Sequence, residues 1–290
     1  MKILVTGATG YVGRHLLPKL LEASNVDVLT INRCLEKARD SLPKLNCRHL
    51  SIDEWGEIEG FNPDIVFHLA SMVTSRNDRD VFNNIIESNI MFGLKLLDGI
   101  KKCSNLKLFV NTGSFAEYRL GVGKIDNAYL YTATKTAFKQ FVDYYSKLGK
   151  YKYIHVVPYT IYEGRGTQKK IIDYILESFE SDVPIKMTRG EQVLDFIHIE
   201  DVVSFYAFIL QNINRLKELP NGETLFLGTG RGISIKELVV LLEKKYGKRA
   251  NIEWGALPYR ERDVMHAVAP IGKLIELGWM PKITIEKYFL

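Results

Sequence analysis

The first thirteen residues, MKILVTGATGYVG (Met1–Gly13), run an apolar strand directly into three glycines and the start of a helix. Gly7, Gly10 and Gly13 stand three residues apart. Such glycines allow a tight turn and let the backbone approach a pyrophosphate, whose charge the amides at the N-terminus of the next helix can hold. A glycine triplet by itself is also compatible with an ordinary loop. The strand before it and the helix after it favour a dinucleotide-binding turn.

The same alternation of strand and helix continues along the first half of the chain. Short apolar runs occur as KILVTG, VDVLTIN, CRHLSI, DIVFHLA, LKLFVNTG and YIHVVPY, and amphipathic stretches such as 12–24, 80–103 and 131–148 separate them. Continuous apolar strands are typical of a parallel sheet that is buried on both faces. The intervening stretches are long enough for right-handed crossover helices. The sequence therefore predicts a doubly wound α/β domain of the Rossmann type.

The pattern changes after Pro158, where two glycine-containing loops, YEGRGTQ and MTRGEQ, flank a predicted helix over about residues 170–181. DFIHIEDVVSFYAFIL predicts a strand and a helix, and ETLFLGTG predicts another strand. SIKELVVLLEKKYG predicts a helix with Ser234 as its N-cap and Gly247 at its end. We expect a dinucleotide-binding domain over residues 1–160 and 193–228. A smaller, discontinuous substrate domain is expected over residues 161–192 and 229–290.

Composition and charge narrow the class of protein. The 290 residues are 46% hydrophobic, which is ample for a core, and basic and acidic residues are interleaved within a net charge of +5. Without a long basic block, nucleic acid is not an expected partner. Cys34, Cys47 and Cys103 lie far apart and have no metal-binding spacing, so we expect reduced thiols and no metal site. No secretory signal or membrane-spanning run is visible, which predicts a cytoplasmic protein.

Hydroxyl groups follow the fifth predicted strand in FVNTGSFAEY (Phe109–Tyr118). Ligands of an open parallel sheet lie beyond the carboxyl ends of its strands, so we expect Thr112 and Ser114 to face the ligand cleft. Tyr131 and Lys135 stand four residues apart on a predicted helix and therefore share one face. A phenol titrates near pH 10, and a nearby ammonium favours its phenolate. A Tyr and a Lys four residues apart on a helix often occur by chance. The hydroxyls after the fifth strand and the glycines after the first favour the interpretation that this pair is functional.

Together these motifs resemble the extended short-chain dehydrogenase/reductase family of NAD-dependent epimerases and dehydratases, over nearly the whole chain. The resemblance rests on the glycine spacing, the Y-x-x-x-K pair and an H-x-A element at His68–Ala70. It implies that Tyr131 protonates a carbonyl oxygen as hydride reaches the carbon, while Ser114 hydrogen-bonds the same oxygen. It also implies that Lys135 supports the phenolate and binds the nicotinamide ribose. We expect His68 itself to be structural.

The residues after the second strand set the expected cofactor. Enzymes that select NAD usually have an acid there for the adenosine ribose hydroxyls, whereas this chain has Asn32 and Arg33. A guanidinium matches a 2′-phosphate, so we expect NADP(H), with NAD as the less favoured cofactor. Arg33 as an ordinary solvated residue stays an alternative. The residues expected at the cofactor are Gly7, Thr9, Gly10, Tyr11, Val12, Gly13, Asn32, Arg33, Ile52, Asp53, Leu69, Ala70, Ser71, Thr112, Tyr131, Lys135 and Pro158.

Later motifs resemble the nucleotide-sugar branch of the family. DFIHIEDVV and YRERDV match two of its elements, which implies that Arg260 grips a substrate diphosphate. Phe115 and Ala116 stand where dehydratases of this branch carry acids, so elimination of water is not expected. The combination resembles reductases of nucleoside-diphosphate 4-keto-6-deoxyhexoses of the CDP-abequose and CDP-paratose synthase type, which serve deoxysugar and O-antigen biosynthesis. The residues expected at the substrate are Thr74, Ser114, Phe115, Thr160, Lys169, Lys170, Gln192 and Arg260.

Two other functions remain open at this stage. A nucleotide-sugar 4-epimerase shares the Ser, Tyr and Lys residues but retains bound NAD. A sensor that binds NADPH without catalysis belongs to a different class, and such relatives usually lack the Tyr and Lys pair. The resemblance also implies a homodimer that pairs helices at about residues 84–103 and 131–148. Phe138, Phe141, Tyr144 and Tyr145 on these helices suit either that interface or the core.

Overall fold

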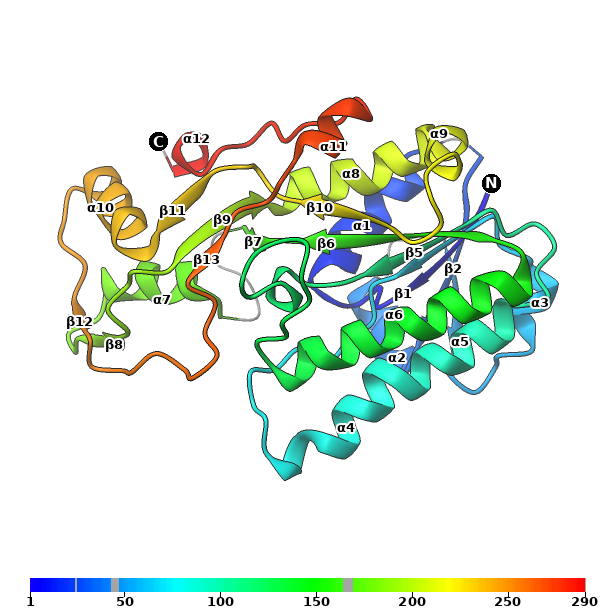
Figure 1. The fold of residues 1–290 in the computed structure, drawn as a ribbon, viewed down its shortest axis with the longest axis horizontal. Coiled ribbons are helices and arrows are strands. Elements are labelled where there is room, and N and C mark those ends of the chain that lie inside the picture. Colours follow the sequence, from blue (N-terminus) through cyan, green and yellow to red (C-terminus); the bar gives the residue numbers. More distant parts are fainter. Residues whose placement is uncertain (24, 43–46, 164–168, 290) are drawn as a thin grey trace.

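A parallel sheet of seven strands forms the centre of the computed structural model, which describes residues 1–23, 25–42, 47–163 and 169–289 (Figure 1). The strands are β1 (Lys2–Thr6), β2 (Asp27–Asn32), β3 (Arg48–Ser51), β4 (Ile65–His68), β5 (Leu108–Thr112), β6 (Lys152–Pro158) and β10 (Glu223–Leu227). Their order is β10-β6-β5-β4-β1-β2-β3, and each neighbouring pair is parallel. The predicted doubly wound α/β fold is confirmed.

The strand order reverses between β1 and β4, because the chain builds outward from β1 in one direction and then in the other. Thr6 at the end of β1 pairs with His68 at the end of β4. A crevice opens beyond the carboxyl ends of the strands at such a switch point, and ligands of doubly wound sheets bind there. The fold therefore places a ligand cleft beside Gly7 and Leu69.

Helices cover both faces of the sheet, and alternate strand residues point to opposite faces. Ile3 and Phe67 lie in the cluster with α1 (Tyr11–Leu21) and α8 (Ile199–Gln211), whereas Leu4 and Val66 lie in the cluster with α3 (Glu57–Phe61) and α5 (Phe92–Ile100). The second face also carries α6 (Leu130–Gly149). α2 (Leu35–Ser41) follows β2, α4 (Phe82–Ile86) precedes α5, and α9 (Ile213–Lys217) and α11 (Gly272–Glu276) lie further along the chain. Helices on both faces bury both sides of the seven-stranded sheet, which explains why its strands are continuously apolar.

A smaller unit stands beside the carboxyl ends of the main strands, at the left of Figure 1. Its four-stranded sheet contains β7 (Thr160–Tyr162), β9 (Val193–His198), β11 (Gly232–Ser234) and β13 (His266–Ala267), and β8 (Ile185–Met187) pairs with β12 (Ile252–Trp254). The helices α7 (Ile171–Ser178), α10 (Ile235–Tyr246) and α12 (Ile285–Phe289) contribute to its core. The helix predicted over 170–181 is therefore shorter than expected. Ser234 and Gly247 cap α10 as predicted.

The position of β9 corrects one predicted boundary. We expected residues 193–228 to belong with the dinucleotide-binding domain, but β9 pairs with β7, β11 and β13 of the smaller sheet. The rest of that segment agrees with the expectation, since α8 packs against α1 and β10 extends the main sheet. The remaining division into two domains stays a prediction.

Two buried carboxylates hold segments from later in the chain against β9 and α8. Asp195 in β9 accepts hydrogen bonds from the backbone N–H groups of Thr229, Gly230 and Ala269. Asp201 in α8 accepts from the N–H groups after Pro281 at distances of 2.8 to 3.0 Å. Ionised carboxylates make strong bonds with backbone donors. Segments far apart in sequence are thereby fixed next to the strand that leads from the small sheet into α8.

Candidate active site

The turn after β1 has the shape that a pyrophosphate requires. Gly7 has a φ of +73°, and a Cβ atom there would lie 2.6 Å from the backbone nitrogen of Ala70. A Cβ atom at Gly13 would lie 2.3 Å from the carbonyl oxygen of Gly7. α1 begins after Gly10, whose position has no side-chain cap, and its first turn contains no acid. The helix N-terminus is therefore available to hold an anion through backbone N–H groups.

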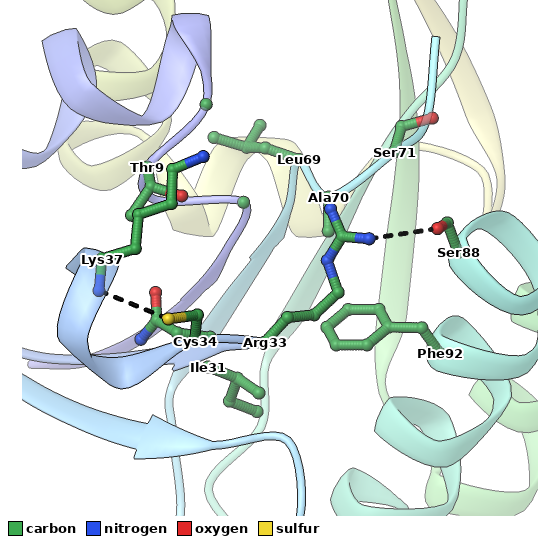
Figure 2. A pocket seen from close by; sticks show the side chains of 13 residues that line it. Thr9, Ile31, Arg33, Cys34, Lys37, Leu69, Ala70, Ser71, Ser88 and Phe92 are labelled. Atoms are coloured by element: carbon green, nitrogen blue, oxygen red, sulfur yellow. Dashed lines mark hydrogen bonds between the residues drawn. The ribbon is translucent and has the colours of Figure 1, made fainter. Parts of the chain in front are cut away.

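A pocket continues from this turn toward the end of β2 (Figure 2). Arg33 extends beside Ala70 and Phe92, and its Nη1 lies 3.5 Å from the hydroxyl of Ser88. The side-chain amide of Asn32 donates to Thr30, which leaves its carbonyl oxygen as an acceptor. The residues that line the pocket are Gly7, Thr9, Gly10, Ile31, Asn32, Arg33, Cys34, Lys37, Leu69, Ala70, Ser71, Ser88 and Phe92. They include two cations and no carboxylate.

Some residues expected at the cofactor lie outside this lining. Ile52 packs against the core on the α5 side, and Asp53 is exposed with its carboxylate 3.4 Å from the Ser51 hydroxyl. The hydroxyl of Thr112 pairs with the phenol of Tyr206 in α8 at 3.1 Å, instead of standing free toward the cleft as we expected. Contacts of these residues with a cofactor stay predictions. Tyr11 and Val12 start α1, and Pro158 ends β6 at the same edge of the sheet.

The predicted catalytic residues lie together beyond the ends of β4 and β5. The hydroxyls of Ser114 and Ser71 both lie close enough to the phenol of Tyr131 to act on it. Lys135 follows one helical turn later on α6 and is 4% exposed. Burial lowers the pKa of Lys135 to about 8, although the charge of Glu117 acts in the opposite direction. Burial raises the pKa of Tyr131, and the same carboxylate raises it further. The catalytic roles themselves stay predictions.

Asn89 is a site residue that the sequence analysis missed. It lies in a π-helical turn (Glu87–Met91) between α4 and α5 and is 3% exposed. Its oxygen accepts from the Met72 N–H at 2.7 Å and from the Ser71 hydroxyl at 3.2 Å. Its amide donates to the Met72 carbonyl and to the Thr134 hydroxyl on α6. Asn89 thereby holds the segment after β4, including Ser71, against the helix that carries Tyr131.

His68 is part of the core, as we expected. Its ring packs among Phe92, Phe109 and Phe138, and its Nδ1 lies 2.9 Å from the hydroxyl of Thr6. Burial lowers the pKa of His68 to about 3, and the charge of Lys135 contributes to the shift. The imidazole is therefore neutral near pH 7 and is not expected to act as an acid there.

A second group of expected residues meets above the N-terminus of α6. The Tyr129 hydroxyl donates to Asp263 at 3.2 Å, and the Gln192 amide reaches the same carboxylate at 3.4 Å. The guanidinium of Arg260 lies over the Tyr129 ring, 5.7 Å from its centroid. Tyr129 is the N-cap residue of α6, so Arg260 and Gln192 lie near the start of the helix that carries Tyr131. Their contacts with a substrate stay predictions.

The other expected substrate residues are more scattered. Lys169 makes an exposed ion pair with Glu177 on α7 at 2.8 Å and does not point into the site. Lys170 donates to the Ile161 carbonyl and lies 3.7 Å from the centroid of the Tyr11 ring, beside the phosphate turn. The two side chains thus point to different partners, and contacts of either lysine with a substrate stay predictions. Phe115 stacks on Tyr159, Thr160 begins β7, and Thr74 accepts from a neighbouring N–H.

Two negative findings apply to the described ranges. Within them, no three His, Cys, Asp or Glu side chains are grouped so as to hold a metal ion. Within the same ranges, none of the helices has the length and apolar character needed to cross a membrane.

Residues 3–224 match the model of the NAD dependent epimerase/dehydratase family. The chain belongs to this family. CDP-abequose synthase from Salmonella typhimurium is 31% identical over 301 aligned positions, which cover 98% of this chain and 95% of the relative. CDP-abequose synthase from Yersinia pseudotuberculosis is 26% identical, with 91% of each chain covered. Membership of the family supports binding of a nicotinamide nucleotide, as we predicted.

Solved structures of family members have the same fold. UDP-glucuronic acid 4-epimerase from Bacillus cereus, in complex with UDP-glucuronic acid and NAD, superposes with a TM-score of 0.86 over 100% of this chain and 96% of that one. UDP-glucose 4-epimerase from Thermotoga maritima gives a TM-score of 0.81 with the same coverage. Identities of 24% and 22% make this a likeness of fold.

Proposed function

We propose that this protein is an NADPH-dependent reductase that converts the C4 ketone of a nucleoside-diphosphate 4-keto-6-deoxyhexose to an alcohol. The observation that carries the proposal is the Tyr131 phenol, on which the Ser114 and Ser71 hydroxyls act and which lies one helical turn from the buried Lys135. This phenol has hydroxyl groups beside it and an ammonium four residues later on the same helix. Such an arrangement suits proton donation to a carbonyl oxygen.

The proposed reaction gives a defined part to each of three residues, Ser114, Tyr131 and Lys135. When bound, NADPH supplies the hydride that reduces C4 and leaves as NADP⁺. Ser114 donates a hydrogen bond to the ketone oxygen, where negative charge develops as the carbon is reduced. Tyr131 gives its proton to that oxygen, which completes the alcohol. Lys135 stabilises the resulting phenolate until a proton from solvent restores the phenol.

The preference for NADPH follows from the pocket at the end of β2. Arg33 and Lys37 line it, and no carboxylate does, so a 2′-phosphate meets two positive charges and no repulsion. The solved relatives named above were crystallised with NAD or with a nucleotide sugar, so selectivity for NADPH is a property we propose for this chain.

The substrate class follows from the relatives and from two apolar residues. Phe115 and Ala116 after Ser114 can transfer no proton, which disfavours elimination of water. The similarity to CDP-abequose synthases over 98% of the chain favours a CDP-linked sugar and a role in deoxysugar or O-antigen biosynthesis. All three cysteines are free, which is in keeping with a cytoplasmic protein. The exposed apolar side chains of α4 and α6 are consistent with a homodimer.

The experiment is a screen of CDP-, dTDP-, GDP- and UDP-linked 4-keto-6-deoxy sugars for oxidation of NADPH. We expect turnover with one of them and a loss of about 10²- to 10⁴-fold in kcat/KM for Tyr131→Phe, because the general acid is removed. Binding of NADPH to this variant should be nearly unchanged. Tyr246→Phe, at an exposed position on α10, is the matched control and should behave as wild type. NADPH binding without turnover on any of these sugars would contradict the proposal and leave a non-catalytic sensor.

A 4-epimerase is the second candidate, because the superposed structures include 4-epimerases bound to NAD. The two reactions differ in the fate of the hydride. Purified protein that carries NAD and interconverts UDP-sugars without added cofactor would identify an epimerase. Stoichiometric oxidation of added NADPH identifies a reductase.

A further inference from the structure

A buried carboxylate lies directly beneath the catalytic serine. Glu117 is 1% exposed, its Oε1 accepts from the backbone N–H of Ser114 at 2.7 Å, and its Oε2 accepts from the Thr136 hydroxyl on α6 at 2.8 Å. The Nε2 of His155 in β6 lies 3.7 Å from Oε1. The Nδ1 of His155 lies 3.0 Å from the Asn111 amide, which places the ring proton on the nitrogen that faces Glu117. A fully buried acid and base thus adjoin the reaction site, and the proposed mechanism does not use them.

The backbone makes room for this pair. Gly113 lies between β5 and Ser114, and a Cβ atom there would be 2.5 Å from Nε2 of His155 and 2.6 Å from Oε1 of Glu117. Its φ is not among the positive values of the chain, so space rather than backbone conformation requires glycine at this position. Any side chain at residue 113 would displace the imidazole or the carboxylate.

The pair carries one negative charge near neutral pH. Burial favours protonation of Glu117, but the nearby His155 ring and the hydrogen bonds from Thr136 and the Ser114 N–H outweigh it, so the pKa of Glu117 lies below its ordinary value. Burial lowers the pKa of His155 and keeps the ring neutral. The carboxylate acts on both Tyr131 and Lys135 of α6, and it is the acid that supports the charge of this buried ammonium.

The other charged groups around this site act on Lys139 and on the two buried histidines. The charge of Glu117 acts on Lys139 of α6, and so do the charges of Glu223 on β10 and of Asp143. Lys135 and Lys139 act on His155, and Lys135 also acts on His68 of β4. Among the described residues, Glu117 is therefore the anion that faces the catalytic pair.

We propose that Glu117, held by Thr136 and packed beside His155, is a positioning residue for the reaction: its carboxylate fixes Ser114 next to Tyr131 and is the counter-charge of Lys135. This inference rests on the proposed reductase activity for its kinetic consequence and on the geometry alone for its electrostatic one. A nearby anion raises the pKa of both an ammonium and a phenol. Removing it lowers both pKa values, so the protonated, active pair is lost at a lower pH.

The test compares Glu117→Gln with wild type. Glutamine keeps the size of the side chain and an oxygen for the Ser114 N–H, but it removes the charge. We expect the basic limb of the kcat/KM profile, which should fall near the Lys135 pKa of about 8 in wild type, to move about one pH unit or more toward acid. Glu117→Asp retains the charge and should keep the limb near its wild-type position, even if the rate falls.

A control and a second measurement separate this role from simple support of the fold. Asp201→Asn removes another buried carboxylate that accepts backbone N–H groups, and it should lower thermal stability without moving the basic limb. NMR titration of isotopically labelled lysine, with the Lys135 signal assigned by its loss in Lys135→Arg, should give a lower pKa for Lys135 in Glu117→Gln. This measurement needs no turnover.

The outcomes are distinct. An unmoved basic limb and an unmoved Lys135 titration in a folded Glu117→Gln protein would overturn the inference, whatever happens to the rate. A shifted titration in a protein that reduces no 4-keto sugar would overturn the proposed function and leave the electrostatic role of Glu117 standing.

Discussion

Arg33 and Lys37 are the residues on which cofactor selectivity should depend. A charged hydrogen bond to a phosphate contributes about 1.5 to 3 kcal/mol. Arg33→Ala should therefore raise the KM for NADPH about 10- to 100-fold and leave the KM for NADH nearly unchanged, because NADH has no 2′-phosphate. Lys37→Ala should change the same ratio in the same direction. Steady-state kinetics with both cofactors measure the effect.

Arg39→Ala is the matched control for this prediction, because Arg39 lies on α2 but does not line the pocket. It should leave both KM values unchanged. Equal losses with NADPH and NADH in Arg33→Ala would show that the guanidinium binds the shared adenosine moiety and not the 2′-phosphate.

Single residues also mark where sequence reasoning succeeded and where it stopped. The spacing of Tyr131 and Lys135 is readable because an α-helix brings residues four apart onto one face. The partner of Lys135 is not readable, since Glu117 reaches α6 through a turn whose conformation depends on Gly113 and on His155 of another strand. In the sequence, Glu117 only stands one position beyond Phe115 and Ala116, where dehydratases of this branch carry acids. Only the packing of β5, β6 and α6 shows that its carboxylate lies next to Ser114 and α6.

At the scale of elements, the junction of β1 and α1 depends on close contact that a methyl group would prevent. A Cβ atom at residue 13 would lie 2.3 Å from the Gly7 carbonyl and 2.6 Å from Ala8, both backbone positions that cannot rotate away. We expect Gly13→Ala to lower the free energy of unfolding by about 1 to 3 kcal/mol and to weaken dinucleotide binding. Denaturant unfolding and NADPH fluorescence titration measure the two effects.

Gly272→Ala provides the matched control, because a Cβ atom in α11 would meet no heavy atom within 4 Å. It should change stability by less than about 0.5 kcal/mol and leave cofactor binding intact. A Gly13→Ala protein with wild-type stability and affinity would mean that the strand and helix separate without cost. The proposed pyrophosphate site would then lose its structural basis.

Elements with a strong period were predictable, and irregular ones were not. The apolar runs located β1 to β6 because parallel strands are buried on both faces. The π-helical turn at Glu87–Met91 lies inside one predicted amphipathic stretch, and no residue type there marks a change from α-helical to π-helical hydrogen bonds. Asn89 was missed for this reason. The pattern of DFIHIEDVV predicted a strand and a helix but carried no information on which sheet β9 would join.

At the scale of the whole molecule, one face of the chain leaves large apolar side chains uncovered. Large apolar side chains on α4 and α6 are exposed, and they include Phe82, Ile86, Phe141, Tyr144 and Leu148. α4 and α5 follow one another along one line, and α6 runs alongside them in the lower part of Figure 1. Phe138, by contrast, is buried in the core. Exposed apolar side chains gathered on neighbouring helices often mark an interaction site, and we propose that a second copy of the same face covers them by two-fold symmetry.

A charge placed on that face should therefore dissociate the proposed dimer. Tyr144 and Leu148 are 57% and 54% exposed, so Tyr144→Asp combined with Leu148→Asp should not disturb the core of one chain. Light scattering should give twice the 33.2 kDa of the chain for wild type and the single-chain mass for the variant. Val240→Asp, at a position 61% exposed on α10, should stay dimeric. A wild-type mass of one chain at every concentration tested would mean that α4 and α6 face solvent, and their apolar side chains would then need another partner.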